Sequence, residues 1–168
     1  MIDVERLKSL LHLQPLAGEG GYFAQTYRAQ DMIPHEALPS RYRSERAVGT
    51  AIYYLLTPDT FSALHRLHGD EIYHFYLGDP VELLQLAPDG AGKVQTLGPD
   101  LFQGMEVQLV VPHGVWQGSR LRAGGRFALM GTTMAPGFEY EDCELGQRAA
   151  LLGSHPQFRD LIQVLTRA

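Results

Sequence analysis

Short runs of strand-forming residues, separated by turn residues, fill the middle of the chain. Runs rich in Val, Ile, Tyr, Phe, Leu and Thr occupy residues 50–56, 71–77, 81–87, 106–111 and 126–134. Gly, Pro and Asp separate them, and Asp89-Gly90 and Gly124-Gly125 are expected to form hairpin turns. Many short strands at this spacing predict an all-β sandwich or barrel rather than a βαβ fold.

Both ends of the chain show a helical spacing of apolar residues instead. Asp3 can cap a helix within residues 1–13, and Pro156 suits the first turn of a helix within residues 154–168. The two apolar stripes, which we expect to face the core, are Val4, Leu7, Leu10 and Leu11, and Phe158, Leu161, Ile162 and Leu165. The pattern predicts one domain over residues 1–168, with the strands within residues 20–145.

Composition and charge argue against several classes of protein. The chain has 168 residues with 14 Lys and Arg against 19 Asp and Glu, so its net charge of −5 argues against a nucleic-acid-binding surface. Cys143 is the only cysteine, which rules out an internal disulfide. Charged residues interrupt the first thirteen positions, and no apolar run is long enough to span a bilayer. We therefore expect a cytoplasmic protein without a membrane or nucleic-acid partner.

Two groups of charged residues are expected to be solvated. Arg41, Arg43 and Arg46 lie in or next to a polar segment, residues 32–45, that predicts a long loop. The acidic run consists of Glu139, Glu141, Asp142 and Glu144. Tyr140 alternates with these acids, and alternation allows its side chain to point inward.

The candidate chemistry is concentrated in residues 65–78, which hold three of the seven histidines. If residues 61–67 and 71–77 are adjacent strands joined by a tight turn, His65 and Glu71 can converge inside a barrel. Such a pair can bind a divalent transition metal or act as a base with its orienting partner. A buried His–Glu hydrogen bond without function is the alternative. His74 alternates away from Glu71 and joins the site only if a β-bulge turns it inward.

Two further stretches contribute candidate ligand contacts. Gln117 follows a turn at Pro112 and Gly114, and its amide can both donate and accept hydrogen bonds. The strand after Gly20-Gly21 could pair across a dimer, with Tyr27 or Arg28 reaching a pocket. Simple packing is the alternative for most of these residues.

These stretches resemble the two motifs of the cupin family. His65 to Gly78 is similar to the first motif, although Leu67 stands where that motif has a second histidine. Val111 to Ser119 is similar to the second motif, with Gln117 in place of the metal-binding histidine. The segments 20–28, 50–56, 65–84, 111–119 and 134–145 resemble the successive signatures of an uncharacterised branch of small single-domain cupins. This resemblance implies a double-stranded β-helix, or jelly-roll barrel, with terminal helices, a homodimer, and a pocket lined from the barrel interior.

Three functions remain open under this resemblance. In the first, His65, Glu71, His74 and Gln117 weakly hold a divalent transition metal, with Mn, Fe, Ni and Zn as candidates. A carbonyl oxygen from Gln117 suits a harder ion such as Mn²⁺.

The second function is metal-free isomerisation or epimerisation of a sugar or nucleotide sugar, to which members of this branch have been likened. His65 would be the base, Glu71 would orient it, and Tyr73 or Tyr140 would be the acid. The third is non-catalytic binding or sensing of a small polar ligand on the same barrel.

Overall fold

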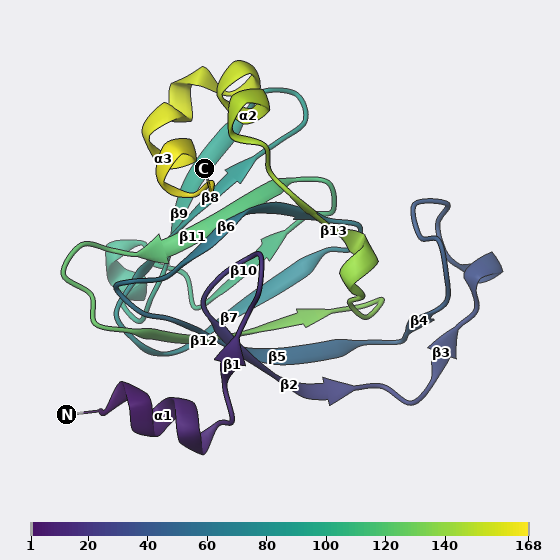
Figure 1. Cartoon of the computed structure of the whole chain (residues 1–168), viewed down its shortest axis with the longest axis horizontal. Helices are drawn as coiled ribbons and strands as arrows, with labels where there is room; N and C mark the ends of the chain where they lie inside the picture. The colour runs from purple at the N-terminus through teal and green to yellow at the C-terminus, as the bar shows by residue number, and fades with distance from the viewer. Residues whose placement is uncertain (1, 168) are drawn as a thin grey trace.

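Two antiparallel β-sheets pack face to face in the computed structural model, which describes residues 2–167 (Figure 1). The six-stranded sheet contains, in spatial order, β1 (Gln14–Pro15), β2 (Tyr22–Arg28), β5 (Thr50–Leu56), β12 (Ala128–Met134), β7 (Glu71–Gly78) and β10 (Gln108–Val111). The five-stranded sheet contains β13 (Cys143–Leu145), β6 (Phe61–Leu67), β11 (Trp116–Leu121), β8 (Val81–Leu86) and β9 (Gly92–Leu97). This double-sheet jelly roll confirms the predicted fold class.

The main core lies between the two sheets, because alternate residues of each strand point inward. Tyr54 of β5, Tyr73 of β7 and Met130 of β12 meet Leu83 of β8 and Leu121 of β11 in one buried cluster. Each of these side chains is at most 9% exposed. Apolar packing between the two sheets therefore forms the main core of the barrel.

Of the two predicted hairpin turns, one is confirmed and the other is wrong. The turn at Asp89-Gly90 joins β8 to β9, which are antiparallel neighbours, so this hairpin is confirmed. The turn at Gly124-Gly125 is not a hairpin, because it carries the chain from β11 in one sheet to β12 in the other. The tight turn at residues 68–70 likewise connects β6 and β7 across the two sheets. His65 and Glu71 therefore face each other from opposite walls rather than from neighbouring strands.

Short helices cover the outer face of each sheet. Asp3 caps α1 (Val4–Leu10) by accepting hydrogen bonds from two backbone N–H groups. The stripe of α1 packs on Leu55, Phe127 and Leu129, although Leu10 is 72% exposed and does not belong to it. No helix within residues 2–167 is long and apolar enough to cross a membrane.

The C-terminal helical region differs from the single helix expected at residues 154–168. It consists of α2 (Arg148–Ser154), the 3-10 turn η4 (Pro156–Phe158) and α3 (Arg159–Val164). His155 is not helical, and Pro156 brings no N–H group to continue α2, so the helix breaks there. The predicted stripe still packs against β6 and β8, as expected.

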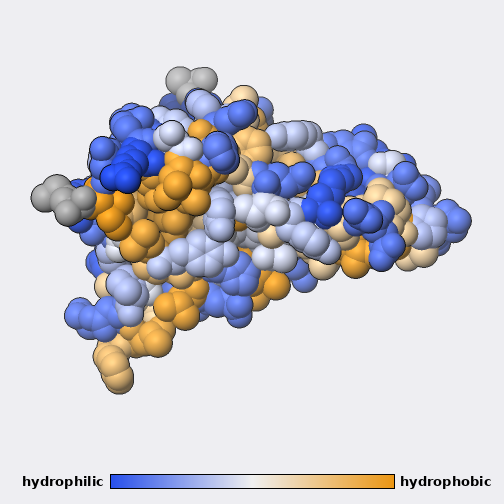
Figure 2. All heavy atoms as spheres, turned by 90° about the horizontal axis from the view of Figure 1, so that it is seen from below, coloured by the Kyte–Doolittle hydropathy of each residue, from blue (hydrophilic) through white to orange (hydrophobic). Residues whose placement is uncertain are grey.

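Between β2 and β5 the chain forms an arm that extends from the barrel and has a mostly hydrophilic surface (Figures 1 and 2). The arm contains β3 (Met32–Ile33), η1 (His35–Ala37) and β4 (Arg46–Ala47), so the predicted loop has some regular structure. At its base Arg46 is 0% exposed, and its guanidinium donates to Asp142 at 2.8 and 2.6 Å. Arg46 and Asp142 are therefore buried, contrary to the solvated positions expected for them. They neutralise each other across 96 residues, a pairing that local charge patterns do not reveal.

Candidate functional site

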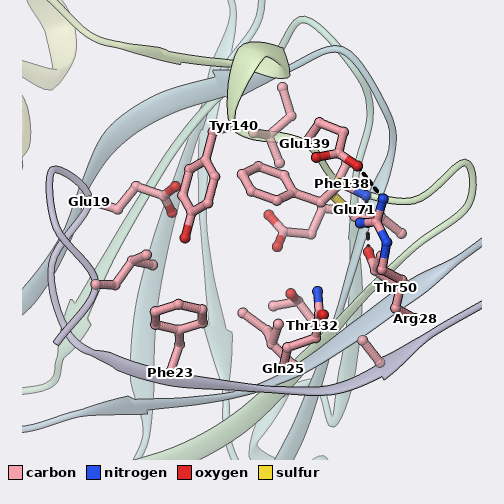
Figure 3. Close-up of a pocket in the computed structure, with 15 residues that line it drawn as sticks. Glu19, Phe23, Gln25, Arg28, Thr50, Glu71, Thr132, Phe138, Glu139 and Tyr140 are labelled. Carbon is pink, nitrogen blue, oxygen red and sulfur yellow. Dashed lines mark hydrogen bonds and ion pairs between the residues drawn. The ribbon is translucent and has the colours of Figure 1, made fainter. Parts of the chain in front are cut away.

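A cavity of about 140 Å³ opens between the sheets at the end of the barrel where β2, β5, β7 and β12 meet two loops (Figure 3). Its polar and aromatic lining includes Glu19, Phe23, Gln25, Arg28, Thr50, Glu71, Thr132, Phe138, Glu139 and Tyr140. The cavity combines three aromatic rings with ionisable groups in one enclosed space, as small-molecule sites commonly do.

Three of the predicted residues come together in the barrel interior beside this cavity. His65 and Gln117 are register partners on β6 and β11, and Glu71 begins β7 on the opposite sheet. Gln117 Nε2 donates to Glu71 Oε2 at 2.7 Å, and all three side chains are buried. Glu71 lines the cavity itself, whereas His65 and Gln117 lie behind the lining. The sequence prediction that His65 and Glu71 converge inside the barrel agrees with this geometry.

Glu19 is a further residue of the group that sequence reasoning missed. His65 Nε2 lies 3.6 Å from Glu19 Oε2, and the Cys143 thiol donates to Glu19 Oε1 at 3.4 Å. His65 Nδ1 lies 2.8 Å from the carbonyl oxygen of Ala63, which fixes the ring orientation. The loop around Glu19 brings its carboxylate into the cavity opposite Glu71 (Figure 3). The only sequence signal is its position between glycines, in Gly18-Glu19-Gly20-Gly21.

Burial is the main cause of the raised pKa of Glu71 in the site. Desolvation raises the pKa of Glu71 above its ordinary value, and the charge of Glu19 adds to the rise. His65, Thr132 and Gln117 favour the ionised form and limit the rise. A carboxyl group with a raised pKa holds its proton closer to neutral pH, which suits it to take up and release protons there.

Three residues that are partly exposed mark the opening of the cavity. Arg28 and Glu139 form an ion pair whose side chains are 39% and 35% exposed. Tyr140 is 66% exposed, packs edge-on against Phe138, and directs its hydroxyl toward the cavity (Figure 3). Thr50 Oγ1 accepts a hydrogen bond of 3.0 Å from the backbone N–H of Phe138, which holds this segment on β5.

Three other predicted residues lie outside the cavity lining. His74 is on the outer face of its sheet, 3.1 Å from Thr133 Oγ1 and stacked on Tyr76. The strand does contain a β-bulge, but it comes after His74 and therefore does not turn that side chain inward. Tyr27 is 56% exposed and does not line the cavity. Tyr73 is buried in the core, and burial together with the charge of Glu71 raises its pKa well above the ordinary value.

The donor set does not fit a transition-metal centre. With His74 on the outer face, the interior group supplies one imidazole from His65, two carboxylates from Glu71 and Glu19, and one amide from Gln117. Gln117 directs its nitrogen at Glu71, while its buried oxygen has no hydrogen-bond partner. Residues 2–167 contain no group of three or more His, Cys, Asp or Glu side chains placed to hold a metal ion.

Comparisons with known proteins agree with the fold and the motifs. The family model "Cupin superfamily (DUF985)" matches residues 5–146. The uncharacterised protein YML079W of Saccharomyces cerevisiae is 32% identical over 132 residues, which are 74% of this chain and 66% of that protein. The match thus spans slightly less than two thirds of the yeast protein.

Solved structures extend the agreement to nearly the whole chain. Protein SO0799 from Shewanella oneidensis is 32% identical with a TM-score of 0.87, covering 99% of both chains. A hypothetical protein from Leishmania major is 28% identical with a TM-score of 0.88, covering 99% of this chain and 100% of its own. Oxalate decarboxylase from Bacillus subtilis, at 12% identity and a TM-score of 0.52, shares the fold alone over 91% of this chain and 37% of its own. The chain belongs to the cupin superfamily, in its DUF985 branch.

Proposed function

We propose that the barrel cavity binds a small polar molecule and that Glu71 exchanges a proton with it, as in an isomerase or epimerase. The observation that carries this proposal is the position of Glu71. It is the most deeply buried carboxyl group in the cavity lining, and burial raises its pKa. A buried acid without a reaction or a ligand would be a net loss of stability, because its ionised form is poorly solvated.

The volume of the cavity is suited to a ligand about the size of a single-ring molecule. Its volume of about 140 Å³ is close to that of a cavity of roughly 150 Å³ that accommodates benzene in another protein. A monosaccharide ring fills such a space. A nucleotide sugar would leave its nucleotide outside the opening, against Tyr140 and the Arg28–Glu139 pair.

The proposed step is proton transfer next to a carbonyl group. The Glu71 carboxylate takes the proton from a carbon beside the carbonyl, and the electron pair of that C–H bond moves toward the carbonyl oxygen. The Tyr140 hydroxyl lies on the opening side and can hydrogen-bond that oxygen. Return of a proton to the same carbon from its opposite face gives an epimer. Return of the proton to the former carbonyl carbon gives an isomer, when the hydroxyl group on the first carbon loses its proton to become the new carbonyl and the former carbonyl oxygen gains one.

This geometry favours different roles from those that the sequence suggested for His65 and Glu71. Glu71 is the group that faces the ligand. His65 is placed behind the lining, near both Glu71 and Glu19, where it stabilises the ionised form of Glu71. His65 is therefore a positioning residue, and Tyr73, which does not line the cavity, has no direct role.

Hydrogen–deuterium exchange tests this proposal directly. The protein is incubated in D₂O with a panel of aldoses, ketoses and their amino derivatives, and loss of carbon-bound protons is followed by NMR. We expect enzyme-dependent exchange that falls by about a hundredfold or more in Glu71→Gln. Glu36→Gln removes the same charge from the exposed arm and should leave exchange unchanged.

Two other outcomes would decide against the catalytic proposal. Exchange that persists in Glu71→Gln would remove Glu71 from the reaction. Saturable binding that depends on Glu71, without exchange for any bound compound, would make the barrel a non-catalytic binding protein.

A further inference from the structure

We propose that the ligand of the barrel cavity is a small organic cation, a protonated amine on a body of about one ring. This inference rests on the cavity being the binding site, as proposed above, and adds the chemical class of its occupant. It is carried by two features of the lining: an excess of carboxylates over cations, and three aromatic rings.

The charges of the lining favour a positive ligand. Glu19, Glu71 and Glu139 line the cavity, against one basic side chain, Arg28, among the described lining residues. Arg28 is already paired with Glu139, so it is not free to neutralise an anion. Glu19 has no Lys or Arg partner among the contacts of residues 2–167. The ionisable groups that contact it are the Cys143 thiol at 3.4 Å and His65 at 3.6 Å. In an enclosed site of low dielectric, this arrangement attracts a cation and repels an anion.

The aromatic residues of the lining also favour a cationic ligand, independently of the charges. Phe23, Phe138 and Tyr140 all line the cavity, and Phe23 lies across it from Tyr140 (Figure 3). Ring faces attract organic cations through their quadrupole, and aromatic residues combined with carboxylates recognise ammonium groups in other proteins. The carboxylates of Glu19 and Glu71 reach into the space that these rings enclose (Figure 3). An ammonium group placed there would contact both kinds of side chain.

Matched pairs of probes test the charge preference. Cyclohexylamine is compared with cyclohexanol, and glucosamine with glucose, because each pair differs chiefly in an ammonium group against a hydroxyl group. Affinities are measured at neutral pH by calorimetry or by NMR titration of the wild-type protein. We expect each amine to bind roughly tenfold more tightly than its hydroxyl counterpart.

Two pairs of variants separate the two features. Glu19→Gln is nearly isosteric and should abolish the preference for the amine, while Glu36→Gln on the exposed arm should preserve it. Tyr140→Phe keeps the ring and should also preserve the preference, whereas Tyr140→Leu should reduce it severalfold. Tyr140 is largely exposed, so neither change is expected to unfold the protein.

The outcomes distinguish this inference from the proposed function. Hydroxyl probes that bind as tightly as the amines, with binding lost in Glu71→Gln, would overturn the cation preference and leave the cavity as the binding site. An amine preference unchanged in Glu19→Gln would also overturn it. Failure of every probe to bind, charged or neutral, would count against both the cavity and its proposed occupant.

Discussion

At the scale of single residues, the buried carboxylate of Glu71 lowers the electrostatic stability of the folded protein. Its carboxyl group is buried against His65, Tyr73 and Gln117, and it shares the cavity with Glu19. The folded protein therefore holds the Glu71 proton more tightly than the unfolded chain does, because the pKa is raised only in the folded state.

Glu71→Gln should consequently stabilise the protein in a pH-dependent way. In the wild type, the free energy of unfolding falls as the pH rises from the ordinary carboxyl pKa, about 4.3, to the raised value in the folded state, and then levels off. The neutral amide does not suffer this loss. Urea denaturation over a pH series should show the variant more stable above the folded pKa, with the advantage vanishing in acid.

The neighbours of Glu71 define the control for that experiment. The charges of Glu19 and His65 act on Glu71, and Tyr54, Tyr73 and Cys143 respond to the charge of Glu71. Tyr54 and Tyr73 have raised pKa values and stay neutral over this range. The same series in Glu19→Gln should show a smaller pH-dependent loss than wild type, because one repulsive charge is gone. A stability difference independent of pH would exclude Glu71 as the titrating group.

The sequence could identify the interior residues of the strands but not the loop residue of the site. His65, Glu71 and Gln117 occupy strand positions whose direction follows from period-2 alternation and from the motif spacing. Glu19 lies in a loop without periodicity, and its direction depends on glycines at 18, 20 and 21 that all have positive φ. The burial of Arg46 could not be predicted from the sequence either, because it depends on Asp142 far along the chain.

At the scale of elements, the loop that precedes β2 places Glu19. Gly20 has a φ of 102° and approaches the backbone carbonyl of Phe61 so closely that a Cβ atom would collide with its oxygen. Backbone atoms cannot move aside as a flexible side chain can. The loop can therefore lie against β6, with Glu19 near His65, only if this residue is glycine.

Gly20→Ala should destabilise the protein and displace Glu19. Gly104 is the matched control, because it also has a positive φ, 76°, but no atom within 4 Å of the added Cβ. We expect Gly104→Ala to cost about 1–2 kcal/mol from backbone strain alone. Gly20→Ala should cost more than this, and should also weaken binding of the amine probes. Equal losses in the two variants, measured by urea denaturation, would show that the close approach to Phe61 is unimportant.

The positions of several strands were predictable, but the sheet to which each strand belongs was not. The predicted run at 50–56 coincides with β5, because β-branched and aromatic residues end at clear turn residues. Both a hairpin and a crossing between sheets, however, use short turns rich in glycine. The turn at residues 122–125 therefore appeared to be a hairpin, and only contacts between distant strands determine that it is not.

At the scale of the whole molecule, the Arg46–Asp142 pair joins the base of the arm to the segment beside the cavity opening. Asp142 lies two residues after Tyr140 in the short η3 turn (Tyr140–Asp142), and His68 Nδ1 lies 3.2 Å from Asp142 Oδ1. One buried ion pair thus connects three regions of the chain.

Removing one partner of this pair should be strongly destabilising. Arg46→Leu leaves Asp142 charged and buried without its main partner, which is expected to cost about 3–5 kcal/mol. The double variant Arg46→Leu, Asp142→Leu should recover much of that loss, because neither charge then remains. Urea denaturation of the two single variants and the double variant measures the coupling. Additive losses would show that the two side chains do not act as a pair.

The homodimer implied by the resemblance stays a prediction for the molecule as a whole. Sedimentation equilibrium should give twice the 18.7 kDa mass of the chain. A mass of one chain at micromolar concentration would contradict it.

The partly exposed Arg28–Glu139 pair at the opening bears on how quickly the cavity exchanges its contents. Mobile ions weaken exposed pairs, so added salt should loosen the segment that carries Phe138 and Tyr140. The residence time of a bound molecule should then shorten with ionic strength, and NMR line shapes can follow this in the wild type and in Arg28→Gln. The variant should show short residence times that no longer respond to salt through this pair. In kinetic terms, we expect the residues that line the cavity to select the occupant, and the Arg28–Glu139 pair at the opening to determine how long the occupant stays.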